Sequence, residues 1–289
     1  MEPSPTNTGT LVGSPEPPRH PRLPALKNNP VDSIGTQSWL WSGANFLAAG
    51  SVPVSDRGFR YGMSVFETIR IANGTAGFLA DHLNRLASAA LKCGFPLPRE
   101  ALAAVPSLLS RLDGPGVARV YITAGDGAPA APAETPRVVL LYEPRLRALP
   151  DNYTVLSSPN PHLPPFGGLK TANYWTNTEA LRRARLLGAE ECLLFRPDGR
   201  LTGAAMANVF VKTDEGWLTP SLQCGARDGV IRAWTLAQIP VRQAPLTREL
   251  VHAAVSVFLT SSWIGLMQVA CLDGQPLQLD REIAELNPL

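Results

Sequence analysis

Lys170 is the side chain of this sequence best suited to nucleophilic chemistry. It follows Gly167 and Gly168, precedes a helical pattern, and is one of only four lysines in the chain. A partly desolvated lysine amine can lose its proton and attack a carbonyl, whereas an arginine guanidinium stays protonated. A lysine in a glycine-rich turn is also a common solvated loop residue. Lys170 is therefore a candidate nucleophile whose assignment depends on what surrounds it.

Three other features could bind an anion. The segment from Gly225 to Arg232 places glycines before a predicted helix start, where free backbone N–H groups and the helix dipole favour negative charge. Ser261 and Ser262 supply hydroxyl donors after an apolar strand, and Arg85 lies on the polar side of a predicted helix. A helix cap, a strand-end turn and a solvated arginine explain the same residues, so spacing alone leaves both interpretations open.

The composition is that of an ordinary globular protein, long enough for two domains. Of the 289 residues, 45% are hydrophobic and 17% are charged, and the net charge of +2 gives no field that favours nucleic acid or an acidic membrane. The cysteines are far apart and lack a metal-binding spacing, which predicts reduced thiols in a cytoplasmic protein and no metal site. They are Cys93, Cys192, Cys224 and Cys271.

Two segments bear on targeting. Residues 1–38 are rich in Pro, Asn, Ser and Thr and lack the apolar core of a signal peptide, which predicts a disordered extension. The stretch from Leu250 to Leu272 contains no charged residue and could be considered as a membrane span. Its hydroxyl side chains, Gly265, Gln268 and many β-branched residues favour buried strands instead. We therefore expect no membrane segment.

Hydrophobic periodicity predicts an α+β chain. Helices are expected over residues 81–93, 99–112, 177–187 and 229–238, with Asp81 and Asp228 as N-caps of the first and last. The first helix is expected to bury Leu83, Leu86, Ala87, Ala90 and Leu91. Strands are expected over 65–71, 117–123, 138–142, 153–157, 191–195, 208–212, 217–219 and 255–259, and a polar loop over 55–62.

These elements suggest two unequal domains. A small N-terminal domain is expected over residues 39–148 and a larger one over 165–289, joined by a proline-rich interdomain segment over 149–164.

Six segments, in this order and with suitable gaps, resemble one known family. They are 55–70, His82 to Leu86, Lys170 with Asn173 and Tyr174, 199–210, 224–232 and 259–269. The chain is similar to the fold-type IV pyridoxal-phosphate enzymes, the class IV aminotransferase family, from about Trp39 to Val269. That family includes branched-chain and D-amino acid aminotransferases and aminodeoxychorismate lyase. The resemblance implies a two-domain fold with a larger C-terminal α/β domain, pyridoxal 5′-phosphate as cofactor, an amino-acid substrate and a homodimer.

The resemblance also implies residue roles. Lys170 would hold the cofactor as a Schiff base and then move protons at the substrate Cα, and Tyr174 would hydrogen-bond the cofactor's phenolic oxygen. The residues that match the family's phosphate site are Arg85, Ser261, Ser262 and the backbone of Val230 and Ile231. The residues that match its substrate pocket are Tyr61, Phe66 and Arg119.

Gly203 departs from the family pattern. It stands five residues before Asn208, where the family has a glutamate that holds a proton on the pyridine nitrogen. A protonated ring is the electron sink for a Cα carbanion, so losing that charge should weaken the sink. Thr202 is adjacent but is expected to point to the opposite side of an extended segment.

The substrate class stays open between two branches of the family. Cys224 with Gly225, and the segment 259–267, resemble aminodeoxychorismate lyase, which eliminates pyruvate, whereas 61–67 resembles branched-chain aminotransferases. We favour the lyase slightly over a branched-chain or D-amino acid aminotransferase. A protein that binds the cofactor without turnover is a further alternative, because of Gly203.

Overall fold

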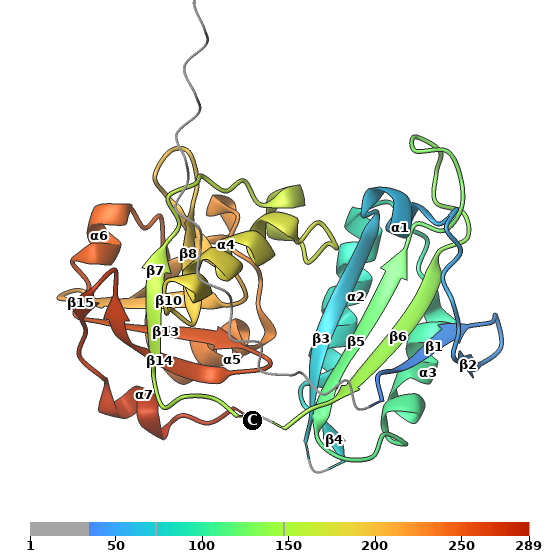
Figure 1. Ribbon diagram of the computed structural model, residues 1–289, viewed down its shortest axis with the longest axis horizontal. Coiled ribbons are helices and arrows are strands. Elements are labelled where there is room, and N and C mark those ends of the chain that lie inside the picture. Colours follow the sequence, from blue (N-terminus) through green and yellow to red (C-terminus); the bar gives the residue numbers. More distant parts are fainter. Residues whose placement is uncertain (1–34, 73, 147, 289) are drawn as a thin grey trace, which may run out of the picture.

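The computed structural model describes residues 35–72, 74–146 and 148–288. Most of the segment predicted as a disordered extension lies outside these residues, but its last two residues, Gln37 and Ser38, belong to a strand. Two sheets lie side by side along the long axis of the molecule (Figure 1), one from each half of the chain.

The N-terminal half contains a six-stranded antiparallel sheet in the order β2-β1-β6-β5-β3-β4. Its strands are β1 (Gln37–Trp41), β2 (Phe46–Ala48), β3 (Ser64–Ala72), β4 (Thr75–Ala76), β5 (Gly116–Thr123) and β6 (Arg137–Pro144). Its helices are α1 (Arg57–Tyr61), α2 (Leu79–Lys92) and α3 (Arg99–Leu109). Helices α2 and α3 cover one face of this sheet, which leaves the other face toward the C-terminal half (Figure 1).

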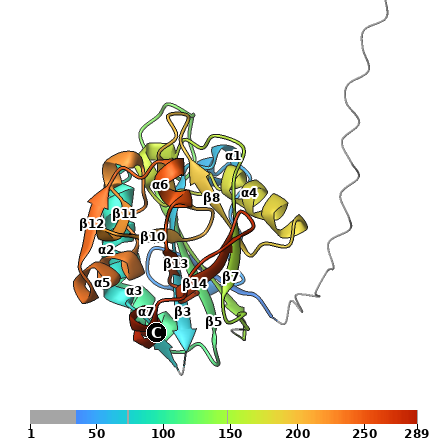
Figure 2. The same ribbon diagram turned by 90° about the vertical axis from the view of Figure 1, so that its left-hand side faces the viewer.

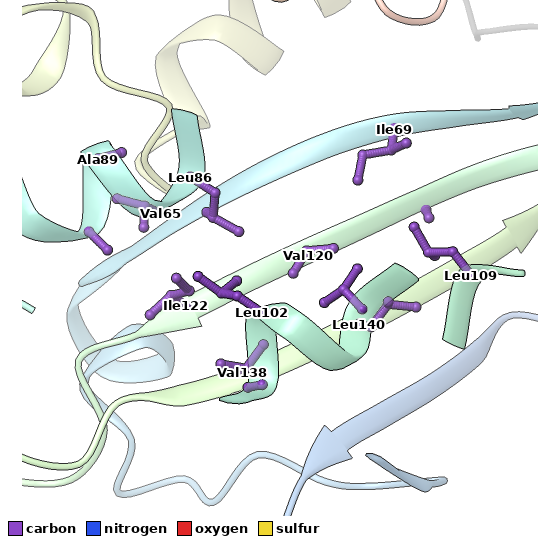
Figure 3. Packing of buried hydrophobic residues seen from close by; sticks show 14 of the residues in the cluster. Val65, Ile69, Leu86, Ala89, Leu102, Leu109, Val120, Ile122, Val138 and Leu140 are labelled. Carbon is purple, nitrogen blue, oxygen red and sulfur yellow. The ribbon is translucent and has the colours of Figure 1, made fainter. Parts of the chain in front are cut away.

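The alternation of side chains along β3 and β5 separates core from cavity. Val65 and Ile69 of β3 and Val120 and Ile122 of β5 pack against the two helices (Figure 3). The residues that alternate with them along each strand face the other way and line a cavity, among them Phe66, Thr68, Arg119 and Tyr121. The helix-covered face thus holds the sheet together while the opposite face is available for binding.

Leu86 and Leu91 of α2 offer a test of this core. Leu86 is 0% exposed within it, whereas Leu91, which the sequence predicted to face inward, is 58% exposed. We expect Leu86→Ala to lower the free energy of unfolding by about 3 kcal/mol, through lost burial and the cavity left behind. The matched Leu91→Ala variant should change it by less than ~0.5 kcal/mol. Urea unfolding followed by circular dichroism measures both, and equal losses would contradict the packing.

The C-terminal half contains a nine-stranded mixed sheet in the order β12-β11-β10-β13-β14-β7-β8-β9, with β15 beside β14. Its strands are β7 (Tyr153–Ser157), β8 (Glu191–Phe195), β9 (Leu201–Ala204), β10 (Asn208–Thr213), β11 (Gly216–Pro220), β12 (Val241–Ala244), β13 (Ser256–Ser261), β14 (Gly265–Leu272) and β15 (Gln275–Pro276). Its helices are α4 (Trp175–Leu186), α5 (Val230–Gln238), α6 (Arg248–His252) and α7 (Arg281–Glu285), with short 3₁₀ turns η1 (Pro165–Gly168) and η2 (Leu222–Cys224). Figure 2 shows α4 and α5 on opposite flanks of this half.

Several predictions about local structure were wrong. The expected loop at residues 55–62 contains the helix α1, which Asp56 caps by accepting a hydrogen bond from the Gly58 N–H. Asp81 lies in the first turn of α2 and does not cap it. Gly229, in place of Asp228, is the N-cap of α5.

The uncharged stretch near the C-terminus forms strands, as expected. Most of its length is taken up by β13 and β14, which pair with each other. None of the helices in the described part of the chain has the length and apolar character that a membrane crossing requires.

Candidate active site

A cavity of about 930 Å³ lies between the two sheets. Its walls come from β3 and β5 on one side and from α4, β9, the start of α5 and the β13–β14 turn on the other. This volume is at the upper end of the range typical of small-molecule sites. The face of the N-terminal sheet that the helices leave open therefore becomes one wall of a binding site.

Lys170 is held at the junction between the sheets. The Lys170 carbonyl accepts a hydrogen bond from the Phe66 N–H at 2.9 Å, and Thr171 forms a β-bridge with Val65, so this segment extends the edge of β3. Gly168 has a φ of +94°, and a Cβ there would lie 2.6 Å from the Gly225 carbonyl oxygen. The glycine before the lysine is therefore required by a close backbone approach.

The Lys170 amine is partly buried among aromatic rings. Its Nζ lies 3.3 Å from the Tyr174 Oη and 4.2 Å from the centroid of the Phe66 ring. Burial lowers the pKa of Lys170 most, Tyr174 opposes this shift and the positive charge of Arg227 adds to it, so that the resulting pKa is about 8. A lysine with a depressed pKa has a larger fraction of neutral, nucleophilic amine near neutral pH.

Tyr174 receives two positively charged donors. Lys170 Nζ and Arg227 Nη1 both donate to its hydroxyl oxygen. Burial alone would raise the pKa of Tyr174, but the charges of Lys170 and Arg227 outweigh it and lower the pKa to about 8. The lysine and the tyrosine therefore titrate as a pair.

Donors for an anion gather on the opposite side of the cavity. The first N–H groups of a helix have no intrahelical partner, and in α5 these belong to Val230 and Ile231, which line the cavity. Ser261 and Ser262 lie at the β13–β14 turn, and the buried Thr260 hydroxyl beside them has no hydrogen-bond partner. This set of donors, which includes the unpartnered Thr260 hydroxyl, suits the oxygens of a phosphate group.

Arg85 and the N-terminus of α5 are joined across the two halves. Arg85 Nη1 donates to the Asp228 carbonyl at 2.6 Å. Its Nε and Nη2 both donate to the Glu67 carboxylate, at 2.7 and 2.5 Å. A Cβ on Gly229 would lie 2.0 Å from Asn208 Oδ1, so a larger residue here would displace the Asn208 side chain, whose Nδ2 donates to the Arg227 carbonyl.

A buried chain of hydrogen bonds runs from Glu67 to the second part of the anion site. Glu67 Oε2 lies 2.7 Å from His82 Nδ1, and His82 Nε2 lies 3.1 Å from Ser262 Oγ. Burial raises the pKa of Glu67, but Arg85 and His82 outweigh it and hold the pKa at about 2. The carboxylate is therefore charged at neutral pH, so His82 donates its Nδ1 proton to it, and this fixes the ring beside Ser262.

Gly203 lines the cavity and supplies no charge. Its φ is +152°, and a Cβ there would contact only the Ala207 carbonyl, at 3.3 Å. The neighbouring Thr202 hydroxyl donates to the Leu194 carbonyl, at 2.9 Å. Glu191 of β8 also lines the cavity; burial raises its pKa to about 7, and it accepts hydrogen bonds from backbone N–H groups.

Phe66 and Arg119 lie on the sheet wall of the cavity. Phe66 stacks on Tyr121 with ring centroids 5.2 Å apart, and Arg119 Nη1 donates to Glu143 Oε1 at 2.6 Å. Tyr61 differs, because it ends α1 with its ring 41% exposed beneath Arg60, outside the cavity wall. Within one chain, Tyr61 is not placed to contact a ligand in this cavity.

Several residues of the cavity have no role in the sequence analysis. Arg227 is the most prominent, and His162, Tyr121 and Arg145 are among the others that carry polar groups into it. Arg227 stands within a segment that the resemblance already singled out, but nothing in its spacing indicates that it contacts Tyr174.

Comparisons with known proteins found a matching family model and several relatives. The family model described as Amino-transferase class IV matches residues 64–272. A putative branched-chain-amino-acid aminotransferase of Methanocaldococcus jannaschii is 26% identical, over 82% of this chain and 87% of the relative. Aminodeoxychorismate lyase of Bacillus subtilis is 28% identical, over 63% of this chain and 66% of the relative.

The fold is shared with solved structures. A branched-chain aminotransferase of Thermoproteus uzoniensis, solved with norvaline, superposes with a TM-score of 0.77 at 20% identity, over 87% of this chain and 92% of the other.

Proposed function

Because the chain belongs to the class IV aminotransferase family, whose enzymes use pyridoxal 5′-phosphate, we propose that Lys170 holds this cofactor covalently and removes the substrate Cα proton. The observation that carries this proposal is the position of the Lys170 amine. It is partly buried beside Tyr174 in the cavity whose opposite wall carries the anion donors. The cofactor's phosphate would bind to the anion donors, which are Arg85, Ser261, Ser262 and the N–H groups of Val230 and Ile231. Tyr174 would face the phenolic oxygen.

The cofactor supplies, when bound, an electron sink next to the substrate Cα. This chain's own residues supply the rest. The cavity walls formed by Phe66 and Tyr121 exclude water from the Lys170 amine, which raises its share of the neutral form. Arg119 is placed to bind a substrate carboxylate with the guanidinium nitrogens that Glu143 leaves free.

Within the family, we favour elimination of pyruvate, as in aminodeoxychorismate lyase. Gly203 provides no carboxylate for the ring nitrogen, so the sink is weaker than a protonated ring would give. In an elimination, the electron pair that the Cα proton leaves behind forms a double bond to the neighbouring carbon, and the leaving group on that carbon departs with the electron pair of its own bond. Transamination has no leaving group, so the electron pair at Cα must be stabilised by the cofactor ring alone. An elimination therefore tolerates Gly203 better.

A branched-chain or D-amino acid transaminase is the second candidate. It is supported by relatives named as branched-chain and D-alanine aminotransferases, which match about four-fifths of the chain. A protein that binds the cofactor without turnover is the third, supported by Gly203.

A substrate panel separates the three candidates. With the cofactor-loaded protein, 4-amino-4-deoxychorismate should release pyruvate without any added keto acid, measured by coupling to lactate dehydrogenase. Amine transfer from L-leucine or D-alanine to 2-oxoglutarate would instead establish the transaminase. Stable cofactor binding with no turnover of either kind would establish the third candidate.

The homodimer implied by the resemblance also remains a proposal. Phe59, Phe166 and Trp175 expose large apolar side chains on α1, η1 and the start of α4. The Asn173 amide donates to the Gly62 carbonyl at 3.3 Å, which joins the segment before α4 to the end of α1. A second subunit that covers these residues would also bring protein to the exposed ring of Tyr61.

A further inference from the structure

Arg227 carries its charge into the cavity from the loop between η2 and α5. Its Nη1 donates to the Tyr174 hydroxyl, and its guanidinium carbon lies 5.1 Å from the centroid of the Tyr174 ring. The backbone that positions it is fixed, because the Arg227 carbonyl accepts hydrogen bonds from Asn208 Nδ2 at 2.7 Å and from the Gly229 N–H at 2.9 Å. The side chain is thus anchored to the same turn that begins α5.

The Arg227 side chain is partly buried without a counter-charge. Its Nε is buried and has no hydrogen-bond partner. No ion pair found among the described residues includes Arg227, whereas Arg85 and Arg119 in the same cavity each pair with a glutamate. Moving a cation even partly out of water without an anion is costly, so its charge favours a negative group nearby.

The oxygen of Tyr174 is where that negative group can form. A phenol has one proton to donate and accepts hydrogen bonds weakly, whereas a phenolate is a strong acceptor of several. Lys170 and Arg227 both direct donors at this oxygen. Two cationic donors on one oxygen stabilise its deprotonated form.

We propose that Arg227 is a positioning residue that holds Tyr174 as a phenolate beside Lys170, so that the lysine–tyrosine pair releases its first proton at a lower pH. This inference rests on the proposed role of Lys170 as the cofactor lysine. It assigns to Arg227 a part in preparing the amine, through Tyr174.

The other charged groups around the pair act more weakly or cancel. The charges of Glu67 from β3 and Arg85 from α2 shift the pKa of Lys170 in opposite directions and less than Tyr174 and Arg227 do. Burial raises the pKa of Tyr121 on β5, so its ring stays neutral. Burial and Arg227 both lower the pKa of His162, so its imidazole adds no charge at neutral pH.

The proton balance follows from two groups that share one proton. With one proton lost, the pair is either a Lys170 ammonium with a Tyr174 phenolate or a neutral Lys170 amine with a Tyr174 phenol. Moving that proton from Nζ to Oη leaves the amine with the lone pair it needs to attack a carbonyl, and no further reactant takes part. Without the charge of Arg227, the first proton leaves only at a higher pH.

The tyrosine titration of the full-length, cofactor-free protein tests this inference. The chain has 5 tyrosines, and burial raises the pKa of both Tyr121 and Tyr142. As the pH is raised, tyrosinate absorbance near 295 nm should therefore show one early step, which is the ionisation of Tyr174 with its pKa of about 8. The Tyr174→Phe variant should lack this step. Arg227→Met should move this step up by about one pH unit or more, and Arg227→Lys should move it less.

Controls separate this effect from a general loss of charge or of fold. Arg145 lines the same cavity with its guanidinium 4.8 Å from the Trp263 ring centroid, so Arg145→Met removes an equal charge and should leave the early step unchanged. Circular dichroism checks that each variant is folded, and Arg227→Lys keeps the test available if the methionine variant unfolds. An early step that stays in place in a folded Arg227 variant, or that is missing from the wild-type chain, overturns the inference.

A second measurement distinguishes this inference from the proposed function. The rate at which pyridoxal 5′-phosphate attaches to the protein, followed by absorbance against pH, should have its midpoint raised by about one pH unit in Arg227→Met. If the cofactor attaches to Lys170 with an unchanged midpoint, Arg227 has no such role and the proposed function stands. If the tyrosine step shifts but the cofactor never attaches to Lys170, the proposed function fails, while Arg227 still controls Tyr174.

Discussion

Replacing Lys170 with alanine is expected to abolish covalent attachment of pyridoxal 5′-phosphate and to lower turnover by about 10⁴-fold or more. The variant loses the amine that forms the bond and the base that takes the Cα proton. Borohydride reduction of the loaded wild-type protein, followed by peptide mass spectrometry, should place the pyridoxyl group on Lys170. The same treatment of the variant should leave every peptide unlabelled.

Two further variants show that the amine itself is responsible. Lys170→Arg retains the positive charge but cannot form the covalent bond, so it should be as inactive as the alanine variant. Lys92, in the last turn of α2, is an exposed lysine, and Lys92→Ala should retain full labelling and activity. A pyridoxyl group found on any other lysine, or an alanine variant within tenfold of wild-type turnover, would show that the assignment is wrong.

Local sequence patterns predicted the helices and strands in which buried side chains recur at a regular spacing. The alternation in β3 and β5 and the spacing in α2 are set by one face that packs against a core, and such periods are visible in the residues themselves. The helix α1 was missed because tertiary contacts maintain it. Arg57 is buried and donates to the carbonyls of Ala124 and Ala131, far along the chain.

In the candidate site, too, local patterns predicted some features, while others depend on tertiary contacts. Family motifs indicated Lys170 and the anion donors, but not the contacts that tune them. Ser262 lies 180 residues from His82, and Arg227 lies 53 residues from Tyr174. A spacing rule cannot detect side chains that only the tertiary fold brings together.

At Gly203, where the sequence departs from the family motif, the structure also shows the backbone conformation. The sequence predicts a missing carboxylate, and restoring it by Gly203→Glu would be the obvious repair. The backbone there has a φ of +152°, which side-chain-bearing residues rarely adopt, and a Cβ would also lie in a tight contact with the Ala207 carbonyl oxygen, at 3.3 Å. The glycine therefore changes the backbone as well as the charge, and a glutamate introduced alone meets strain in β9 before it can reach a ligand.

Glu67→Gln is expected to destabilise the protein by about 3 kcal/mol at neutral pH. Glu67 is 1% exposed and accepts hydrogen bonds from both His82 and Arg85. Removing its charge leaves the Arg85 guanidinium without its buried counter-ion, and an uncompensated charge of this kind lowers the free energy of unfolding by several kcal/mol. Glu143→Gln is the matched control, because Glu143 also pairs with an arginine but its side chain is 36% exposed, and a pair near the surface contributes about 0–1 kcal/mol.

The pH dependence of stability identifies the charge of Glu67 as the cause. Its pKa falls from 4.5 to about 2 on folding, so the unfolded chain binds the proton more tightly than the folded one. The stabilisation, roughly 3 kcal/mol, is therefore complete above about pH 5 and is lost as the pH falls toward 2. Urea unfolding between pH 7 and 3 should show a steeper loss of stability in the wild type than in Glu67→Gln, so that the two curves converge in acid. Parallel curves would show that the variant acts through packing, and that the buried carboxylate does not hold Arg85 by its charge.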